Sequence, residues 1–297
     1  MNAMKDKNLI FDGIATALIT PFSGGRIDFP SFGRLIDLQI ESGVDALVVS
    51  GTTGESPCLT EREKLSLFEF AVARASGRVP VIAGIGCSDT RRTAEAGRAA
   101  CELGCDALLA VTPYYNRPTS SGLYEHYRTV ASLASKPVIA YNVPARTGVS
   151  IPVDVLKKLS DGGYIHAIKE ACGDLSRVAK IISDCQGLTV YSGNDDQTLP
   201  VAALGGRGVI SVSSNICPRE MCEAYRALRR GETERAADMQ RKLTRLASAL
   251  FCEVNPIPIK YAAHLLGYCE CEYRLPLCPP CDTSKEKIRL ALEEFFA

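Results

Sequence analysis

The chain has 297 residues, of which 46% are hydrophobic and 23% charged, with 34 basic and 34 acidic side chains. Zero formal net charge argues against nucleic acid or an anionic membrane as a partner, because binding to either needs a basic excess. No uninterrupted apolar stretch approaches the roughly 20 residues of a membrane span. The start, MNAMKDKNLIFDG, has no apolar core of signal-peptide length. We therefore expect a cytoplasmic globular protein without nucleic-acid or membrane partners.

Short apolar runs with the character of buried strands follow one another along the chain. They lie at 13–20, 45–51, 79–86, 106–115, 136–144, 164–170, 188–194 and 207–215. Helix-like segments separate them, for example 59–76 and 121–135, in which apolar residues recur at three- and four-residue spacing. The first of these segments opens with Thr60 and Glu63, the spacing of a capping box.

Continuous apolar strands that alternate with helices indicate a parallel sheet covered by helices. Eight such units predict an α/β fold of the (β/α)8 TIM-barrel type, for which about 250 residues is usual. A doubly wound open sheet is the alternative, but it usually has fewer strands. From about residue 217 the pattern changes to helices alone, and the first of these completes the eighth unit. We predict a catalytic barrel over 1–232 and a C-terminal helical extension over 233–297.

Thirteen cysteines are many for this chain. Their odd number, without a secretory signal, favours free thiols in a reducing compartment over a disulfide framework. Four of them gather near the C-terminus: Cys269, Cys271, Cys278 and Cys281. Zinc binds such sulfur ligands, but this spacing is not that of a common zinc knuckle. A redox-active CPPC motif is a further alternative. We favour ordinary thiols over both and expect no metal site.

Lys169 ends the sixth apolar run, where a charged side chain needs an explanation. Residues two apart along a strand share a face, so Lys169 points the same way as Ala167 and Ala171. Ile168 and Glu170 point the opposite way. Space and low polarity lower the pKa of a lysine, and a neutral amine can form a Schiff base with a carbonyl. A solvated lysine at a strand end is the alternative that spacing alone leaves open.

Two further strand ends carry groups that suit a keto acid, and the strand ends of a barrel meet at one mouth. GTTGE, at 51–55, offers hydroxyls and backbone N–H groups for a small carboxylate. YNVPARTG, at 141–148, places the phenol of Tyr141 five residues before the guanidinium of Arg146. A phenol can move protons near a Schiff base, and a guanidinium can bind a carboxylate through two hydrogen bonds. A plain loop, a packed tyrosine and a surface arginine are the alternatives.

Other polar residues fit different chemistry less well. The histidines, at His126, His166 and His264, lie at no metal-ligand spacing, which argues against a metal-dependent aldolase. We interpret Asp195 and its neighbours as helix-capping and loop hydrogen-bonding groups. Glu55 with Asp195 would be a weak carboxylate pair for glycoside hydrolysis.

These motifs together resemble the dihydrodipicolinate synthase / N-acetylneuraminate lyase family. They cover nearly the whole chain in the order GIATALITPF, GTTGE, VTPYYNRP, YNVPARTG, IKEACGD, SGNDD, GVISVSSN and RLPL. The resemblance implies a class I aldolase-type lyase that needs no metal or organic cofactor. The implied reaction is the Schiff-base condensation of pyruvate with L-aspartate 4-semialdehyde to 4-hydroxy-tetrahydrodipicolinate, in lysine and diaminopimelate biosynthesis.

The resemblance also implies catalytic roles for particular residues. Lys169 would form the Schiff base with pyruvate. Tyr141 would donate and accept protons in a relay with Thr52 and Tyr115. In the family, the tyrosine that matches Tyr115 enters from a neighbouring subunit, which implies a homo-oligomer, commonly a dimer of dimers.

Substrate-binding roles follow from the same resemblance. Thr53 and the backbone near Ile210 would hold the pyruvate carboxylate, and Gly193 would line the pocket. Arg146 would bind the carboxylate of aspartate semialdehyde. A pyruvate-dependent sugar-acid aldolase, such as an N-acetylneuraminate or 2-keto-3-deoxy-sugar-acid lyase, is the alternative, although such enzymes usually lack this arginine. A non-catalytic barrel that binds a keto acid is a further alternative, but it has no use for a proton relay.

The lysine-feedback site of the family is only partly matched. Ser56 and Tyr114 match effector-binding positions. Residues that differ from those of sensitive members stand at Pro57, Glu61, Lys64, Ser88 and Arg92. Two of the usual residues are histidines, which Glu61 and Lys64 replace. We therefore predict weak or absent inhibition by L-lysine.

Overall fold

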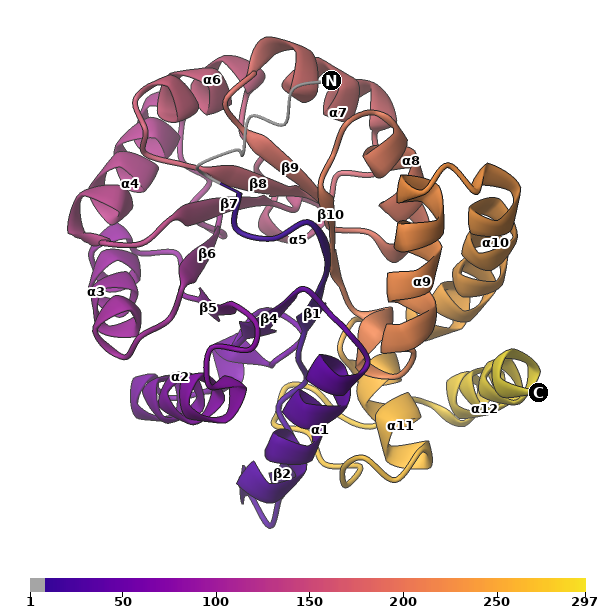
Figure 1. Cartoon of the computed structure of the whole chain (residues 1–297). Coiled ribbons are helices and arrows are strands. Elements are labelled where there is room, and N and C mark those ends of the chain that lie inside the picture. Colours follow the sequence, from indigo (N-terminus) through magenta and orange to yellow (C-terminus); the bar gives the residue numbers. More distant parts are fainter. Residues whose placement is uncertain (1–8) are drawn as a thin grey trace.

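The computed structural model describes residues 9–297 and contains a closed barrel of parallel strands. The barrel strands are β1 Gly13–Ala17, β4 Ala46–Val49, β5 Val81–Gly84, β6 Ala107–Val111, β7 Val138–Asn142, β8 Ala167–Glu170, β9 Thr189–Ser192 and β10 Gly208–Ser211. They follow the order β1-β10-β9-β8-β7-β6-β5-β4, and β1 also pairs with β4 to close the ring (Figure 1). All eight predicted strands are therefore confirmed, and the open sheet is excluded.

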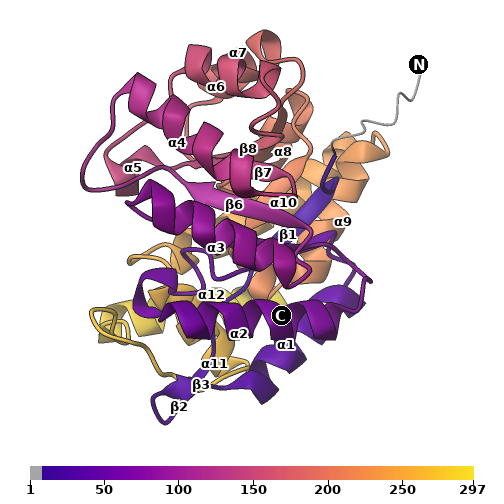
Figure 2. The ribbon, with the colours of Figure 1, turned by 90° about the vertical axis from the view of Figure 1, so that its left-hand side faces the viewer.

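Helices surround this barrel (Figures 1 and 2). Those up to the end of the eighth unit are α1 Phe29–Glu41, α2 Glu61–Ala75, α3 Thr90–Glu102, α4 Ser120–Leu133, α5 Pro144–Thr147, α6 Val153–Asp161, α7 Leu175–Asp184, α8 Thr198–Ala203 and α9 Pro218–Arg229. The predicted capping box begins α2. The Thr60 hydroxyl accepts a hydrogen bond from the Glu63 N–H, and the Glu63 carboxylate accepts one from the Thr60 N–H.

Side chains of the strands alternate between the inside of the barrel and the layer under the helices, as the period of two requires. In β8, Ala167 belongs to the cluster inside the barrel, whereas Ile168 belongs to the outer cluster. At the end where β1 begins, the rings of Phe11 and Tyr191 stack inside the barrel with their centres 4.0 Å apart. The Tyr191 hydroxyl donates a hydrogen bond to the Phe11 carbonyl oxygen at 2.7 Å. Ring packing therefore fills this end, and the opposite end carries the reactive groups.

One small element is absent from the predicted set. Strands β2 (Phe22–Ser23) and β3 (Arg26–Ile27) form an antiparallel hairpin between β1 and α1, which projects at the edge of the molecule in Figure 2. Its turn consists of Gly24 and Gly25 with φ of 57° and 79°, a backbone conformation that favours glycine. Strands of two residues are too short to show a period in the sequence.

The C-terminal segment is helical, as predicted, and comprises α10 Thr233–Leu250, α11 Ile257–Leu265 and α12 Asp282–Phe296. Helix α10 packs against α9 and α12 (Figure 1). In α11, the Lys260 ammonium lies 2.6 Å from a carboxylate oxygen of Glu55, and both side chains are 0% exposed. Glu55 is therefore engaged in an ion pair and is not available as a glycosidase carboxylate. The division into domains at residue 232 stays a prediction.

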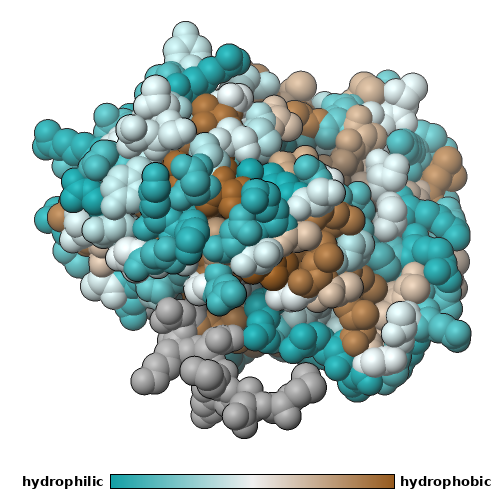
Figure 3. Space-filling model, turned by 90° about the horizontal axis from the view of Figure 1, so that it is seen from above, coloured by the Kyte–Doolittle hydropathy of each residue, from teal (hydrophilic) through white to brown (hydrophobic). Residues whose placement is uncertain are grey.

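Membrane-spanning helices, the surface, the cysteines and metal-ligand clusters bear on the class of function. Among residues 9–297, no helix combines the length and the hydropathy needed to cross a membrane. Figure 3 shows polar side chains over much of one face, with apolar ones gathered near its centre and towards one side. All thirteen cysteines are free thiols. In the described part of the chain, no three or more His, Cys, Asp or Glu side chains are grouped to hold a metal ion.

Candidate active site

A cavity of about 230 Å³ opens at the carboxyl ends of strands β4 to β7. Its lining consists of Ser50, Gly51, Thr52, Ser56, Pro57, Lys64, Gly84, Gly86, Cys87, Leu109, Val111, Tyr114, Tyr141, Val143, Arg146 and Thr147. Three predicted site residues, Thr52, Tyr141 and Arg146, thus lie around one cavity. The parallel register brings them together although they follow different strands.

Lys169 lies in β8 directly beside Tyr141 of β7. Its side-chain nitrogen is 4.5 Å from the centre of the Tyr141 ring, and the residue is 5% exposed. Burial lowers the pKa of Lys169 from 10.5 to about 8, while the Asp195 carboxylate raises that pKa and the Arg146 guanidinium lowers it. A substantial fraction of the amine is therefore neutral near pH 8, as nucleophilic attack on a carbonyl requires.

Glu170 faces away from Lys169, as the alternation of the strand predicts. Its carboxylate accepts hydrogen bonds from Asn142 Nδ2 at 2.7 Å, from Arg177 Nε at 3.0 Å and from the Cys172 backbone N–H at 3.0 Å. This carboxylate is satisfied on the outer side of the strand. It is not the counter-ion of Lys169.

Gly193 follows β9 and allows the backbone to pass close to Lys169. A Cβ atom at this position would lie 2.6 Å from Ala171 Cβ and 3.1 Å from Lys169 Cε. Any larger residue would clash with Ala171 and crowd the lysine side chain, because real Cβ contacts are almost never as short as the first distance and rarely as short as the second. The predicted pocket glycine therefore borders the lysine.

Tyr141 is buried, and this burial raises the pKa of its phenol above the ordinary value. Arg146 and a hydrogen bond with Thr52 act in the opposite direction. The phenol is consequently protonated at neutral pH and in contact with Thr52. The third residue of the predicted relay, Tyr115, does not join them, because it is 95% exposed with a φ of 73°. Its neighbour Tyr114 lines the cavity.

Thr53 is buried and is linked to Arg146 through a residue that the sequence motifs did not single out. Asn255 Nδ2 donates a hydrogen bond to Thr53 Oγ1 at 3.0 Å. Arg146 Nη2 donates to the Asn255 carbonyl oxygen at 3.2 Å. Ile210 lies in β10 and is buried inside the barrel. No local spacing points to Asn255, since it lies in the C-terminal extension.

The predicted role of Asp195 as a loop hydrogen-bonding group is confirmed, and its carboxylate also acts on the pKa of Lys169. Its Oδ2 accepts hydrogen bonds from the Val212 N–H at 3.1 Å, from the Ser213 N–H at 2.8 Å and from the Ser213 hydroxyl at 2.9 Å. The same carboxylate raises the pKa of Lys169. This influence on the lysine was not predicted, because it depends on where the loop after β9 folds.

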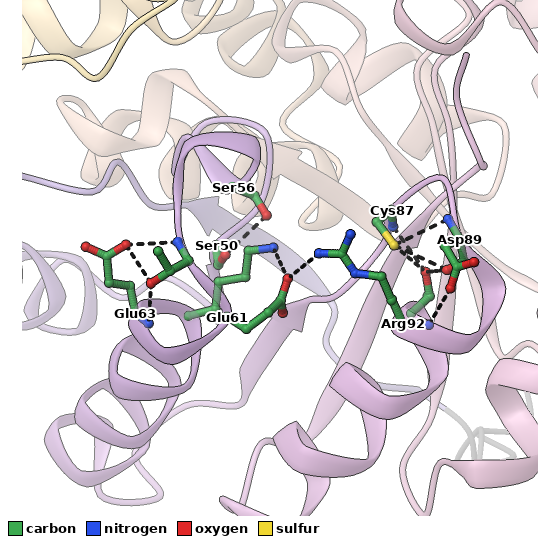
Figure 4. A network of polar contacts seen from close by, with 10 residues as sticks. Ser50, Ser56, Glu61, Glu63, Cys87, Asp89 and Arg92 are labelled. Carbon is green, nitrogen blue, oxygen red and sulfur yellow. Dashed lines mark hydrogen bonds and ion pairs between the residues drawn. The ribbon is translucent and has the colours of Figure 1, made fainter. Parts of the chain in front are cut away.

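Three of the residues that the resemblance aligned with lysine-feedback positions, Glu61, Lys64 and Arg92, are bound to one another. The Glu61 carboxylate lies 3.4 Å from the Lys64 ammonium and 3.2 Å from the Arg92 guanidinium; Figure 4 shows the second of these contacts. Nearby, the Ser50 hydroxyl donates to the Ser56 hydroxyl at 3.3 Å. Glu61 thus pairs with both basic side chains, Lys64 and Arg92.

A closed (β/α)8 barrel with a desolvated lysine at a strand end and a buried phenol beside it defines a lyase of the class I, Schiff-base aldolase type. The model of the dihydrodipicolinate synthetase family matches residues 10–295. The chain therefore belongs to the dihydrodipicolinate synthetase family.

Individual relatives agree with this assignment. The 4-hydroxy-tetrahydrodipicolinate synthase of Aquifex aeolicus is 45% identical over 288 residues, which cover 96% of this chain and 98% of the relative. The crystal structure of dihydrodipicolinate synthase from the same organism superposes with a TM-score of 0.95 at 44% identity, over 96% of this chain and 98% of that one. The chloride-inhibited dihydrodipicolinate synthase from Acinetobacter baumannii, complexed with pyruvate, gives a TM-score of 0.94 at 39% identity, over 97% and 99% of the two chains.

Proposed function

We propose that the chain condenses pyruvate with L-aspartate 4-semialdehyde to 4-hydroxy-tetrahydrodipicolinate, a step of lysine and diaminopimelate biosynthesis. The observation that carries this proposal is the desolvated amine of Lys169, which lies beside the phenol of Tyr141 at the barrel mouth. The names of the relatives support the product, and the structure of one synthase complexed with pyruvate supports the first substrate. Arg146 at the cavity favours a second substrate with a carboxylate over a polyhydroxylated sugar acid.

The first half of the reaction forms an enamine on Lys169. The neutral amine attacks the keto carbon of pyruvate and forms a C–N bond, and the keto oxygen leaves as water to give an iminium ion. The positive nitrogen draws electrons from the methyl group, which then loses a proton to give the enamine. Tyr141, hydrogen-bonded to Thr52, is placed to move these protons, because burial keeps its phenol protonated between transfers.

The second half joins the two substrates. The enamine carbon attacks the aldehyde carbon, and a proton from Tyr141 neutralises the resulting alkoxide. The amine of the second substrate then attacks the iminium carbon, closes the ring and displaces Lys169 as a free amine. Thr53 and the backbone near Ile210 hold the pyruvate carboxylate, and Arg146 holds the other carboxylate. Side chains and substrates carry every step, so the proposal includes no metal or organic cofactor.

The proposed relay needs Tyr115 from a second copy of the chain. A tyrosine that is 95% exposed and adjacent to a cavity-lining residue is suited to enter the mouth of a neighbouring barrel. The working form in this proposal is a homo-oligomer, a dimer of dimers, in the cytoplasm. Sedimentation velocity tests the assembly: a monomeric parent protein with full activity would contradict the shared relay.

Trapping with borohydride tests the proposed chemistry. Incubation with pyruvate and borohydride, followed by peptide mass mapping, should place one reduced adduct on Lys169. Lys169→Ala should abolish the adduct, and Lys158→Ala, a change at an exposed lysine, should retain it. If no adduct forms on Lys169 in the parent protein, aldolase chemistry of any substrate range is wrong. Where trapping succeeds, faster turnover of a sugar-derived aldehyde than of aspartate semialdehyde would favour the sugar-acid aldolase instead.

A further inference from the structure

Asn255 lies between α10 and α11 and contacts two distant parts of the barrel mouth at once. Its side-chain amide reaches Thr53 in the turn after β4, and its carbonyl oxygen accepts from Arg146 in α5. The residue is 6% exposed, so water does not compete freely for these bonds. Thr53 and Arg146 are the residues to which the proposed function gives the two substrate carboxylates.

The direction of the bond to Thr53 matters for a carboxylate ligand. A hydroxyl group has one hydrogen to donate and two lone pairs that accept. Asn255 Nδ2 is the donor to Thr53 Oγ1, so this contact uses a lone pair and leaves the hydroxyl hydrogen available. A carboxylate only accepts hydrogen bonds. The contact thus leaves the Thr53 hydroxyl oriented to donate its hydrogen to a carboxylate.

The other end of the Asn255 amide is unused. Its Oδ1 is buried and has no hydrogen-bond partner among residues 9–297. Buried side-chain amides usually satisfy both ends, because an unpaired buried oxygen is unfavourable. An asparagine with a purely structural role would be expected to form a hydrogen bond through that oxygen as well. Within the described part of the chain, the side chain of Asn255 forms its hydrogen bond with Thr53 instead.

A second contact fixes the same two segments relative to each other. Lys260, one turn further along, forms the fully buried ion pair with Glu55, two residues after Thr53. The Lys260 backbone N–H donates to the Pro256 carbonyl oxygen at 3.0 Å, which ties that residue to the stretch containing Asn255. The turn after β4 is therefore held at two points, by Asn255 just before α11 and by Lys260 within it, and Asn255 has little freedom to move away from Thr53.

From these contacts we infer that Asn255 is a positioning residue for substrate binding. Its amide orients the Thr53 hydroxyl as a donor to the pyruvate carboxylate, and its carbonyl oxygen holds the Arg146 guanidinium at the mouth. The inference rests on the proposed function, since it presumes that Thr53 and Arg146 bind the two substrates. It assigns the C-terminal extension a part in substrate recognition that acts through Thr53 and Arg146.

Steady-state kinetics of Asn255→Ala and Asn255→Asp provide the test. Loss of the amide donor in Asn255→Ala should raise the KM for pyruvate roughly 3- to 10-fold. The turnover number should stay within about twofold of the parent value, because the interaction contributes to binding rather than to the chemical step. The KM for the second substrate should change less, since the backbone carbonyl that contacts Arg146 is retained. Val254→Ala, at the adjacent exposed position, is the matched control and should leave both KM values unchanged.

The substitution Asn255→Asp distinguishes a role of Asn255 in orienting the Thr53 hydroxyl from a role in packing alone. Aspartate has the shape of asparagine, so a packing role predicts that it is milder than alanine. Orientation predicts the reverse at pH 8: an ionised carboxylate would take the Thr53 hydrogen and repel pyruvate, which raises the KM on the order of 10- to 100-fold. Relative to the parent, this KM should fall again at lower pH as the new carboxyl group takes up a proton and becomes a donor.

A double-mutant cycle with Thr53→Val completes the experiment. Once the hydroxyl is gone, Asn255→Ala should add no further increase in the KM for pyruvate. Additive effects, or an Asn255→Asp variant with the KM of the parent, would overturn the inference. Should Asn255→Ala fail to fold in thermal unfolding, the isosteric Asn255→Asp carries the comparison. Borohydride trapping on Lys169 in the parent is measured alongside: its absence defeats the proposed function, whereas trapping with unchanged pyruvate half-saturation in the variants defeats this inference alone.

Discussion

Two opposite charges, on Asp195 and Arg146, act on Lys169, so its pKa should move in opposite directions when each is removed. Burial lowers that pKa from 10.5 to about 8, against a raising effect of Asp195 and together with a lowering effect of Arg146. At pH 7.5 a pKa of 8 leaves roughly a quarter of the amine neutral, whereas a pKa of 10.5 leaves roughly a thousandth. Desolvation therefore increases the reactive form on the order of 200-fold.

Asp195→Asn and Arg146→Gln are the informative substitutions. The first removes the carboxylate that raises the pKa of Lys169, so the pKa should fall below about 8. The second removes the guanidinium that lowers it, so the pKa should rise. Attack on pyruvate needs the neutral amine, and the rate of imine formation therefore increases with pH through this pKa. Asp195→Asn should shift that increase to lower pH, and Arg146→Gln should shift it to higher pH.

Rapid mixing with saturating pyruvate, a borohydride quench and mass analysis measure this rate between pH 6 and pH 10. The parent should show a midpoint at about 8. Asparagine can still accept the hydrogen bonds of Ser213 through its oxygen, and thermal unfolding checks that the variant remains folded. A parent rate that still rises without levelling off at pH 10, as the ordinary lysine pKa of 10.5 would require, would refute the reasoning. Shifts of both variants in the same direction would refute it as well.

The remaining predictions concern tight contacts, the buried ion pair and the effector response. Gly193→Ala should slow imine formation on the order of 10- to 100-fold by displacing Lys169, and unchanged trapping would show that the contact is not restrictive. Lys260→Met should destabilise the fold by about 3–5 kcal/mol in urea unfolding, because Glu55 stays buried without a partner. Adding Glu55→Gln to Lys260→Met should recover part of the lost stability. Equal stability of the single and the double variant would contradict the prediction. L-Lysine should leave the initial rate nearly unchanged, since Glu61 and its ion pairs occupy the feedback positions; saturable, steep inhibition would show that this prediction is wrong.

Local sequence patterns predicted the structure correctly wherever the apolar residues recur with a clear period. The eight apolar runs predict the barrel, and the alternation within β8 places Lys169 with Ala167 on the inner face. The same alternation correctly turns Glu170 away from the amine. The capping box at Thr60 follows from a spacing of three residues, which is itself a local signal.

Contacts between distant segments gave no such signal. Thr53 and Asn255 are 202 residues apart, and Glu55 and Lys260 are 205 apart. Neither pair has a spacing that a periodicity could reveal. Lysine is rarely fully buried without a partner, and the partner of Lys260 is too distant in the sequence to be recognised. The placement of Tyr115 outside the site of its own chain came from the family resemblance alone.

The long separation between Thr53 and its partner also governs when the protein becomes competent during synthesis. A ribosome that adds about 5–20 residues per second takes roughly 10 to 40 seconds to travel from Thr53 to Asn255. During that time the turn after β4 exists without the amide that orients it and without the ammonium that neutralises Glu55. A nascent chain that already contains all eight strands therefore lacks the two contacts which, under the proposed function, order the pyruvate site. If Asn255 positions Thr53 as inferred, catalytic competence in this barrel is a late event of translation, reached only after the segment that contains Asn255 and Lys260 has been made.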